Sequence, residues 1–265
     1  WPYGLETIHA TCHANDIPLV VLPGDDKPDP SLVRFNTVDA PTQLALWSYL
    51  NQGGALNARN FLIYDRALLD GDTASIPTAS PLLKAGLWWP ETTQPALSDL
   101  QDIWNADAPV VAITFYRALL QSGNTQPVSA LVDALAAQGM NALPVYVSSL
   151  KEEISQATIR TLFGKASPSV VINLTGFAVS SVEGERVPTV LEENGAVVLQ
   201  AVLASGSEEA WDESAQGLSS RDLAMNVALP EVDGRVLSRA IAFKNASDFD
   251  EATQANIVRH VARQD

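Results

Sequence analysis

The stretch Val110-Val-Ala-Ile-Thr-Phe115 is an apolar run of strand length, and it opens a regular alternation of strand-like and helix-like segments. Similar apolar runs follow at residues 142–147, 169–174 and 196–200. Between them, residues 128–138 and 150–163 carry apolar side chains at helical spacing, and a shorter helix is expected to end near residue 194. Continuous apolar strands that alternate with helices are typical of a parallel sheet covered on both faces. We therefore predict a doubly wound, mainly parallel α/β lobe over residues 109–265.

The C-terminal part of this lobe is less regular. An acidic turn, Pro230-Glu-Val-Asp-Gly234, precedes an expected strand over residues 239–243, and residues 252–265 form a polar, helix-like stretch. The chain opens on Trp1 without an initiator Met, and it closes on that stretch without an evident helix cap. We therefore expect it to be a segment of a longer polypeptide.

The N-terminal part predicts a second α/β lobe. The apolar run Pro18–Leu22 is interpreted as a buried strand. Helical patterns cover residues 5–15, 41–51 and 56–69. We predict an incomplete lobe over residues 1–75, and a linker over residues 76–108 because this stretch is rich in Pro, Thr, Ser and Asp. The predicted fold class is α/β, with two Rossmann-like or flavodoxin-like lobes.

The composition excludes several classes of protein. The chain has 16 Lys and Arg against 31 Asp and Glu, a net charge of −15, which argues against a nucleic-acid partner because phosphate binding needs a basic surface. Hydrophobic residues make up 46% and charged residues 18%, which is typical of a globular protein. No apolar run approaches the ~20 residues that span a bilayer. With a single Cys and no signal peptide, we expect a cytoplasmic protein without membrane contact or disulfides.

The generic catalytic motifs do not occur. Gly164-Lys165 is followed by Ala166 and has no Gly five residues before it, so it is not a phosphate-binding loop. No Gly-x-Gly-x-x-Gly follows a predicted strand, and neither His-Glu-x-x-His nor Gly-x-Ser-x-Gly is present. We therefore expect no ATP site within this sequence.

Two N-terminal clusters contain possible metal ligands. His9, Cys12 and His13 share one face of a predicted helix, but a closed zinc site takes four ligands, so we predict surface histidines beside a buried Cys and no metal site. Asp25 and the nearby Asp26 and Asp29 follow a predicted strand. These three carboxylates fit either a hard cation or a solvated turn, and the sequence does not distinguish the two.

Polar side chains end the first strand of the C-terminal lobe. Tyr116 and Arg117 are candidate ligand-binding residues, because open α/β sheets bind ligands beyond the carboxyl ends of their strands. An Arg there presents a planar set of donors to a carboxylate or an amide carbonyl. Either Ser122 or Thr125 is expected to cap the helix that follows.

The same reasoning selects five further residues. Asn173, Thr175 and Phe177 end the third strand of this lobe, so they are expected at the same edge as Arg117. In the acidic turn, Glu231 and Asp233 are candidates for proton transfer or ligand contact, although an ordinary surface turn is the slightly favoured interpretation. No residue is identified as catalytic.

Several motifs together resemble one family. They are Trp1-Pro-Tyr-Gly-Leu-Glu6, Leu22-Pro-Gly-Asp25, Phe115-Tyr-Arg117, Leu143-Pro-Val145, Asn173-Leu-Thr-Gly-Phe-Ala178 and Val227-Ala-Leu-Pro-Glu-Val-Asp-Gly234. This series resembles the amino-terminal region of the large, CobN-type subunit of aerobic cobaltochelatase. The last two motifs are also similar to the porphyrin-binding H subunit of magnesium chelatase.

The resemblance implies a tetrapyrrole-binding subunit of an ATP-dependent, multisubunit ligase. Such an enzyme inserts Co²⁺ into the corrin hydrogenobyrinic acid a,c-diamide in cobalamin biosynthesis. It implies that ATP and Mg²⁺ bind to separate motor subunits, and that the partners are the remainder of the large subunit, these motor subunits and the corrin. The segment alone is expected to be inactive.

Two other hypotheses compete with substrate binding. The segment is alternatively a non-catalytic scaffold that docks other chelatase domains or the motor subunits. A stand-alone periplasmic-type ligand-binding protein also has two α/β lobes, but the absent signal peptide disfavours it. Spectral titration with a corrin or porphyrin distinguishes binding from scaffolding.

Overall fold

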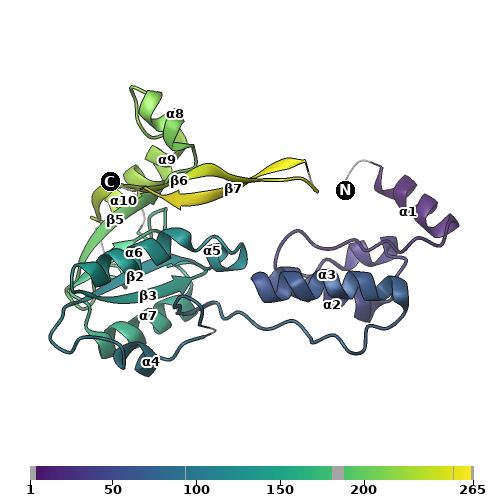
Figure 1. The fold of residues 1–265 in the computed structure, drawn as a ribbon, viewed down its shortest axis with the longest axis horizontal. Helices are drawn as coiled ribbons and strands as arrows, with labels where there is room; N and C mark the ends of the chain where they lie inside the picture. Colours follow the sequence, from purple (N-terminus) through teal and green to yellow (C-terminus); the bar gives the residue numbers. More distant parts are fainter. Residues whose placement is uncertain (1–3, 93, 181–187, 253, 264–265) are drawn as a thin grey trace. The chain divides into compact units, whose positions relative to one another are not determined.

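The computed structural model describes residues 4–92, 94–180, 188–252 and 254–263 (Figure 1). The chain divides into two compact units. The first runs to Leu82 and includes residues 121–123, and the second holds Leu83–Leu120 and the chain from Asn124 onward. Within the described ranges, no helix has both the length and the apolar character to cross a membrane.

The first unit is helical. Its elements are α1 (Leu5–Ala14), a 3₁₀-helix (Pro30–Phe35), α2 (Ala40–Gln52) and α3 (Ala55–Asp70). The three helices expected here are therefore confirmed. Helix α2 begins where it does because the Asp39 side chain accepts a hydrogen bond from the Thr42 amide (2.9 Å), and Pro41 suits the first helical turn.

Residues 18–22, expected to form a strand, have no partner strand in the part of the chain that the structure describes. The backbone amides of Leu19 and Val21 donate instead to the side chains of Thr37 (2.6 Å) and Asn36 (2.5 Å). The predicted strand is wrong because these side chains satisfy the backbone donors that a neighbouring strand would otherwise pair. The α/β class of the chain therefore depends on the second unit alone.

The junction of α2 and α3 depends on Gly53 and Asn57. Gly53 is the C-cap of α2, with a φ of 67°, and a Cβ there would lie 2.7 Å from the Cβ of Gln121, so glycine suits this position. Asn57 is 3% exposed. It donates to the carbonyls of Gly53 (2.8 Å) and Ser80 (2.9 Å), and it accepts from the Ser80 amide (2.8 Å). One buried amide thus ties the turn to the segment around residue 80.

The second unit contains a seven-stranded sheet in the order β1-β3-β2-β4-β5-β6-β7. The strands are β1 (Ala85–Leu87), β2 (Val110–Tyr116), β3 (Asn141–Val147), β4 (Val170–Asn173), β5 (Val197–Leu203), β6 (Val236–Asp250) and β7 (Ala255–Ala262). Strands β3, β2, β4, β5 and β6 pair in parallel, and β1 and β7 add antiparallel edges. The predicted doubly wound, mainly parallel sheet is confirmed.

Three segments differ from expectation. The stretch 76–108, expected as a linker, contains β1 and a short helix, α4 (Leu97–Gln101). Residues 188–195 form turns rather than a helix. The stretch expected to be helical near the C-terminus forms β7, because the long strand β6 offers it a full antiparallel partner and tertiary pairing overrides local preference.

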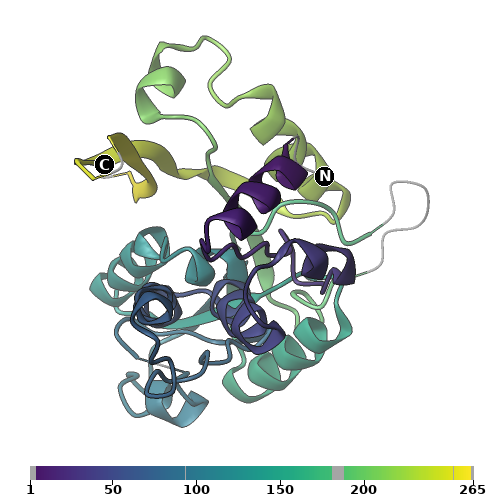
Figure 2. The same ribbon diagram turned by 90° about the vertical axis from the view of Figure 1, so that its right-hand side faces the viewer.

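Helices cover both faces of the sheet. Helix α6 (Gln126–Ala137) lies on one face and α7 (Glu153–Ala166) on the other, while α5 (Arg117–Gln121) follows β2 directly (Figure 1). The alternation follows from the strand order, since right-handed crossovers from β2 to β3 and back to β4 lie on opposite faces. Between β5 and β6, a separate helical segment, green in Figure 2, contains α8 (Glu208–Glu213), α9 (Ser220–Leu223), a π-helix (Ala224–Ala228) and α10 (Leu229–Val232).

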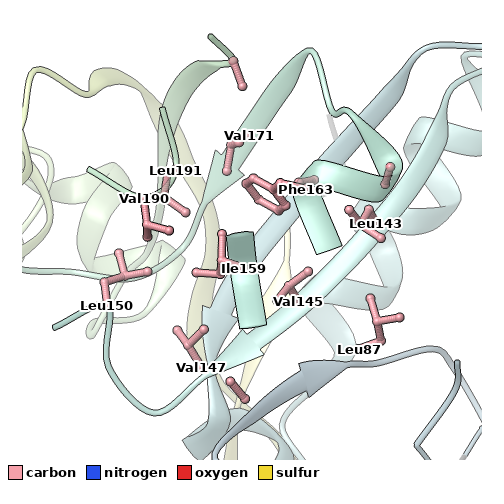
Figure 3. Packing of buried hydrophobic residues seen from close by; sticks show 14 of the residues in the cluster. Leu87, Leu143, Val145, Val147, Leu150, Ile159, Phe163, Val171, Val190 and Leu191 are labelled. Carbon is pink, nitrogen blue, oxygen red and sulfur yellow. The ribbon is translucent and has the colours of Figure 1, made fainter. Parts of the chain in front are cut away.

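The core under α7 is made of apolar side chains from consecutive elements. Ile159 and Phe163 of α7 point at Leu143 and Val145 of β3 and at Val171 of β4 (Figure 3). All five side chains are almost completely buried. Burial of this apolar area stabilises the unit by about 25 cal/mol per Å².

We expect the Ile159→Ala variant to lose roughly 2–5 kcal/mol of unfolding free energy, because the truncation leaves a cavity in a closed core. Ile154 lies on the same helix but is 54% exposed, so Ile154→Ala is the matched control and should cost less than about 0.5 kcal/mol. Urea unfolding followed by circular dichroism measures both. Equal losses in the two variants would contradict the assigned packing of α7.

Strand β7 is held by the loop before α6. Asn124 accepts from the His260 amide (3.1 Å), and its Nδ2 lies 2.7 Å from the ring Nδ1 of His260. The Ala262 amide donates to Gln126 Oε1 (2.7 Å). Burial, and to a smaller extent the Lys244 ammonium, lower the pKa of His260, while a hydrogen bond to the Ala204 backbone acts the other way. The native state therefore favours the neutral imidazole, whose Nδ1 can accept from Asn124.

We expect the second unit to lose stability as the pH falls below about 6.5, the ordinary histidine pKa. A lowered native pKa means that the contribution of His260 is complete above that value and is lost as the unfolded state takes up a proton first. In thermal melts across this range, the melting temperature of the His260→Gln variant should depend less on pH than that of the native chain. The exposed His13 provides a control variant, His13→Gln, which should behave like the native chain.

Candidate functional site

A pocket lies at the carboxyl edge of the sheet in the second unit. Its volume is about 190 Å³, and it is formed by the segments that follow three adjacent parallel strands. Tyr116 ends β2, residues 149–151 follow β3, and residues 175–179 follow β4. This is the edge at which open α/β sheets bind ligands.

A buried network of polar side chains joins the strand ends. The side-chain oxygen Oδ1 of Asn173 accepts from the hydroxyls of Thr114 (2.7 Å) and Thr175 (2.9 Å). The Asn173 amide donates to Gln200 Oε1 (2.8 Å) and to the Thr175 carbonyl (3.0 Å), which also accepts from Gln200 Nε2 (3.0 Å). All four residues are at most 1% exposed, so each partner lost would leave a buried polar group unpaired.

An ion pair between Arg235 and Asp233 adjoins this network. Arg235 Nη2 donates to Asp233 Oδ2 (2.7 Å), and both side chains are at most 1% exposed. Arg235 Nη1 reaches the Thr175 carbonyl and Gln200 Oε1, each at 3.4 Å. Asp233 also accepts from the backbone amides of Val179 and residue 180, both at 2.8 Å. The pair therefore fixes the backbone on both sides of the pocket-lining segment 175–179.

The protonation states follow from this geometry. Burial alone would raise the pKa of Asp233, but the two backbone amides, the Ser180 hydroxyl and Arg235 outweigh it, so the pKa is lowered. Burial also lowers the pKa of Arg235, although Asp233 acts in the opposite direction. Arg235 Nε has no hydrogen-bond partner among the described residues. A buried Arg with one unpaired donor is unusual in a folded protein.

Phe177 is held outward in a strained conformation. Its φ is 64°, a left-handed value that costs a side chain with a Cβ roughly 1–2 kcal/mol, yet its ring is 48% exposed. The Phe177 amide donates to the Met225 carbonyl in the π-helix (2.8 Å). A Cβ on Gly176 would lie 3.0 Å from the same carbonyl, so a larger residue there would require the π-helix to shift. Strained residues and π-helical turns both cluster at functional sites.

The other predicted residues take different places. Tyr116 lines the pocket, and its hydroxyl donates to the Gly176 carbonyl (3.0 Å); burial raises its pKa, against the effect of Arg235. Arg117 is half-buried, and its Nε donates to the Leu83 carbonyl (3.0 Å). Glu231 is exposed on α10 and, unlike Thr175 and Phe177, is not among the pocket-lining residues.

Asn173 and Asp233 make contacts with protein groups and lie outside the described lining of the pocket. Thr125 occupies the N-cap of α6, but its side chain makes no capping hydrogen bond, so the side-chain cap predicted there is not formed. Pro127 lies in the first turn and has no backbone amide that would need a hydrogen-bond partner.

The N-terminal clusters take local roles. The rings of His9 and His13 lie 6.0 Å apart. Asp25 accepts from the Lys27 amide (2.9 Å), and Asp29 caps the 3₁₀-helix through the Ser31 amide (3.0 Å). Across the described ranges, no group of three or more His, Cys, Asp or Glu side chains is placed to hold a metal ion. Asp25 thus stabilises a turn, and Asp29 caps the 3₁₀-helix.

Sequence reasoning missed Gln200, Arg235 and Lys151. Gln200 is the last residue of the run 196–200, so the rule that selected Asn173 would have found it. Arg235 directly follows the acidic turn, and Lys151 lies in the segment that follows β3. No periodic pattern distinguishes these two cations from solvated surface charges.

We expect Asp233→Ala to cost roughly 3–5 kcal/mol of unfolding free energy, because it leaves the Arg235 charge buried without its carboxylate. Glu231→Ala, two residues away and exposed, is the control and should cost less than about 0.5 kcal/mol. Because the native pKa of Asp233 is lowered, its contribution is present above roughly pH 4 and is lost as the pH falls further. Urea unfolding at neutral and acidic pH should therefore show a difference between native chain and variant that shrinks in acid.

Comparison with known proteins gives a consistent result. A model of the CobN/magnesium chelatase family matches residues 47–265. The aerobic cobaltochelatase subunit CobN of Sinorhizobium sp. is 51% identical over 97% of this chain and 21% of its own length. The CobN subunit of Pseudomonas aeruginosa is 34% identical over 99% of this chain and 21% of its own length. The magnesium-chelatase subunit ChlH of Oryza sativa is 28% identical over 60% of the chain and 12% of its own length.

A solved structure has the same fold. The catalytic subunit of cobaltochelatase from Mycobacterium tuberculosis matches with a TM-score of 0.72 and 23% identity, over 99% of this chain and 21% of that chain. The chain thus spans about a fifth of the length of these cobaltochelatase relatives. Because the family match covers most of the sequence, the chain belongs to the CobN/magnesium chelatase family.

Proposed function

We propose that this chain is part of the tetrapyrrole-binding large subunit of an ATP-dependent cobaltochelatase in the cytoplasm. The enzyme inserts Co²⁺, its substrate metal, into hydrogenobyrinic acid a,c-diamide during cobalamin biosynthesis. ATP and Mg²⁺ bind to separate motor subunits, which are partners together with the remainder of the large subunit. The observation that carries the proposal is 51% identity to a named cobaltochelatase subunit along almost the whole chain.

The geometry of the pocket favours contact with the periphery of the tetrapyrrole. Its volume of about 190 Å³ is smaller than the roughly 300–1,000 Å³ of a site that encloses a drug-sized ligand. An edge substituent of the ring enters such a pocket, while the macrocycle stays outside. Phe177, exposed beside the pocket, offers an aromatic face to the apolar plane of the ring.

A non-catalytic scaffold is the second candidate. Arg117, Asn173 and Asp233 make hydrogen bonds to protein groups, as expected for residues that maintain a fold. In that case the exposed ring of Phe177 contacts another domain of the large subunit or a motor subunit. The two candidates differ in one measurable property, the affinity of this chain for a free tetrapyrrole.

Absorbance titration with hydrogenobyrinic acid a,c-diamide tests the proposal directly. Binding should shift the corrin spectrum saturably and quench tryptophan fluorescence. A complete lack of response at high corrin concentration would favour the scaffold.

We expect Phe177 substitutions to separate binding from stability. Phe177→Ala should weaken corrin binding several-fold, whereas Phe249→Ala, which removes a ring of similar exposure on β6, should not. Phe177→Gly should also weaken binding but raise the unfolding free energy by about 1 kcal/mol, because glycine tolerates the left-handed backbone. Equal affinity of the native chain and both Phe177 variants would exclude a role for this ring in tetrapyrrole binding.

A further inference from the structure

The charge of the pocket differs from that of the whole chain. The chain carries a net charge of −15. Among the described residues that line the pocket, however, Lys151 is the only charged side chain, and the others are aliphatic, aromatic or hydroxyl-bearing. A cation that lines a concave site favours a negatively charged ligand.

The backbone around Lys151 holds it at the mouth of the pocket. Lys151 follows β3, and its amide donates to the Ser149 hydroxyl oxygen (3.1 Å). The proton of that hydroxyl remains available to a ligand. Helix α7 begins two residues later, and Glu152 at its N-cap makes no capping hydrogen bond through its side chain. The positive end of the α7 dipole therefore lies near the Lys151 segment.

A second cation lies behind the opposite wall. Arg235 reaches the carbonyl of Thr175, a pocket-lining residue, and its Nε lacks a partner among the described residues although the side chain is 1% exposed. Asp233 balances this charge but is held by Arg235 and two backbone amides. Glu152 and Glu153 directly follow Lys151 in sequence and oppose an anion, and Glu152 Oε2 is buried without a hydrogen-bond partner among the described residues. Neither residue is among those that line the pocket.

The volume limits the size of the ligand. About 190 Å³ corresponds to roughly six water molecules at about 30 Å³ each. A group with a few carbon atoms and one carboxylate fills that space, and a larger ring system does not. Leu150, Ala178 and Val179 provide apolar contacts for the carbon atoms.

We propose that this pocket binds a carboxylate on a short aliphatic arm, with the Lys151 ammonium as counter-ion and the Ser149 hydroxyl as a second donor. The arm belongs either to a tetrapyrrole edge, such as an acetate or propionate side chain, or to a free small carboxylic acid. Only the first source rests on the proposed function. Lys151 is in either case a binding residue.

Propionate and propionamide are the probes, since they differ mainly in charge. Titration of the ¹⁵N-labelled chain with propionate should shift the amide signals of residues 149–155 and 175–179 saturably. Propionamide should bind at least about tenfold more weakly, equivalent to roughly 1.4 kcal/mol. Lys151→Ala should weaken propionate binding by a similar factor, whereas Lys151→Arg should retain most of it. Lys165→Ala, an exposed lysine at the other end of α7, is the matched control and should bind like the native chain.

Each other outcome overturns the proposal. No saturable shift with propionate, equal affinity for propionamide, or unchanged binding by Lys151→Ala would each exclude a carboxylate site at Lys151. Competition then identifies the source of the arm. If hydrogenobyrinic acid a,c-diamide displaces propionate, the pocket takes a ring substituent; if it does not, the pocket takes a free carboxylic acid. Propionate binding without any corrin binding would remove the proposed function and leave the carboxylate site standing.

Discussion

The buried ion pair between Arg235 and Asp233 constrains the segment that follows β4 and contacts Gln200 of β5. Because desolvation offsets the attraction between the two charges, such a pair contributes little net stability. Removal of only one partner is nevertheless strongly destabilising, because the other charge stays buried and unpaired. Here the carboxylate holds the amides of Val179 and residue 180, and the guanidinium reaches the Thr175 carbonyl. The pair thereby specifies the path of the chain after β4, which a hydrophobic pair of equal volume cannot do.

The polar network and the strained residue beside it form one arrangement. Asn173 at the end of β4 is hydrogen-bonded to Gln200 in the middle of β5, and the Thr175 carbonyl accepts from both of these side-chain amides. The segment that follows then has no freedom to relax, so Phe177 keeps a left-handed backbone with its ring exposed. The buried hydrogen bonds of Asn173 and Gln200 thus hold the unfavourable backbone conformation of Phe177 at the surface.

Much of the candidate site was predictable, but the roles were not. The rule that ligands bind beyond the carboxyl ends of parallel strands selects Tyr116, Thr175 and Phe177, and all three line one pocket. The same rule selects Asn173, which is buried beneath the pocket-lining chain. Sequence position gives the edge of the sheet on which a residue lies, and only packing decides whether its side chain faces a ligand or a neighbouring strand.

The sequence by itself determined the alternation of strands and helices over 109–174 and the resemblance to the CobN/magnesium chelatase family, because apolar periodicity and local motifs are properties of the sequence itself. The tertiary structure alone decided the conformation of two short segments. Residues 18–22 lack a strand to pair with, and residues 255–262 become β7 because β6 offers them a partner. It also decided the Arg235–Asp233 pair and the place of Lys151. The two residues of the pair are neighbours in sequence, but the contacts of the pair with Thr175, Val179 and Gln200 join distant segments. The segments that line the pocket with Lys151 are also distant in sequence, and no local pattern records such contacts.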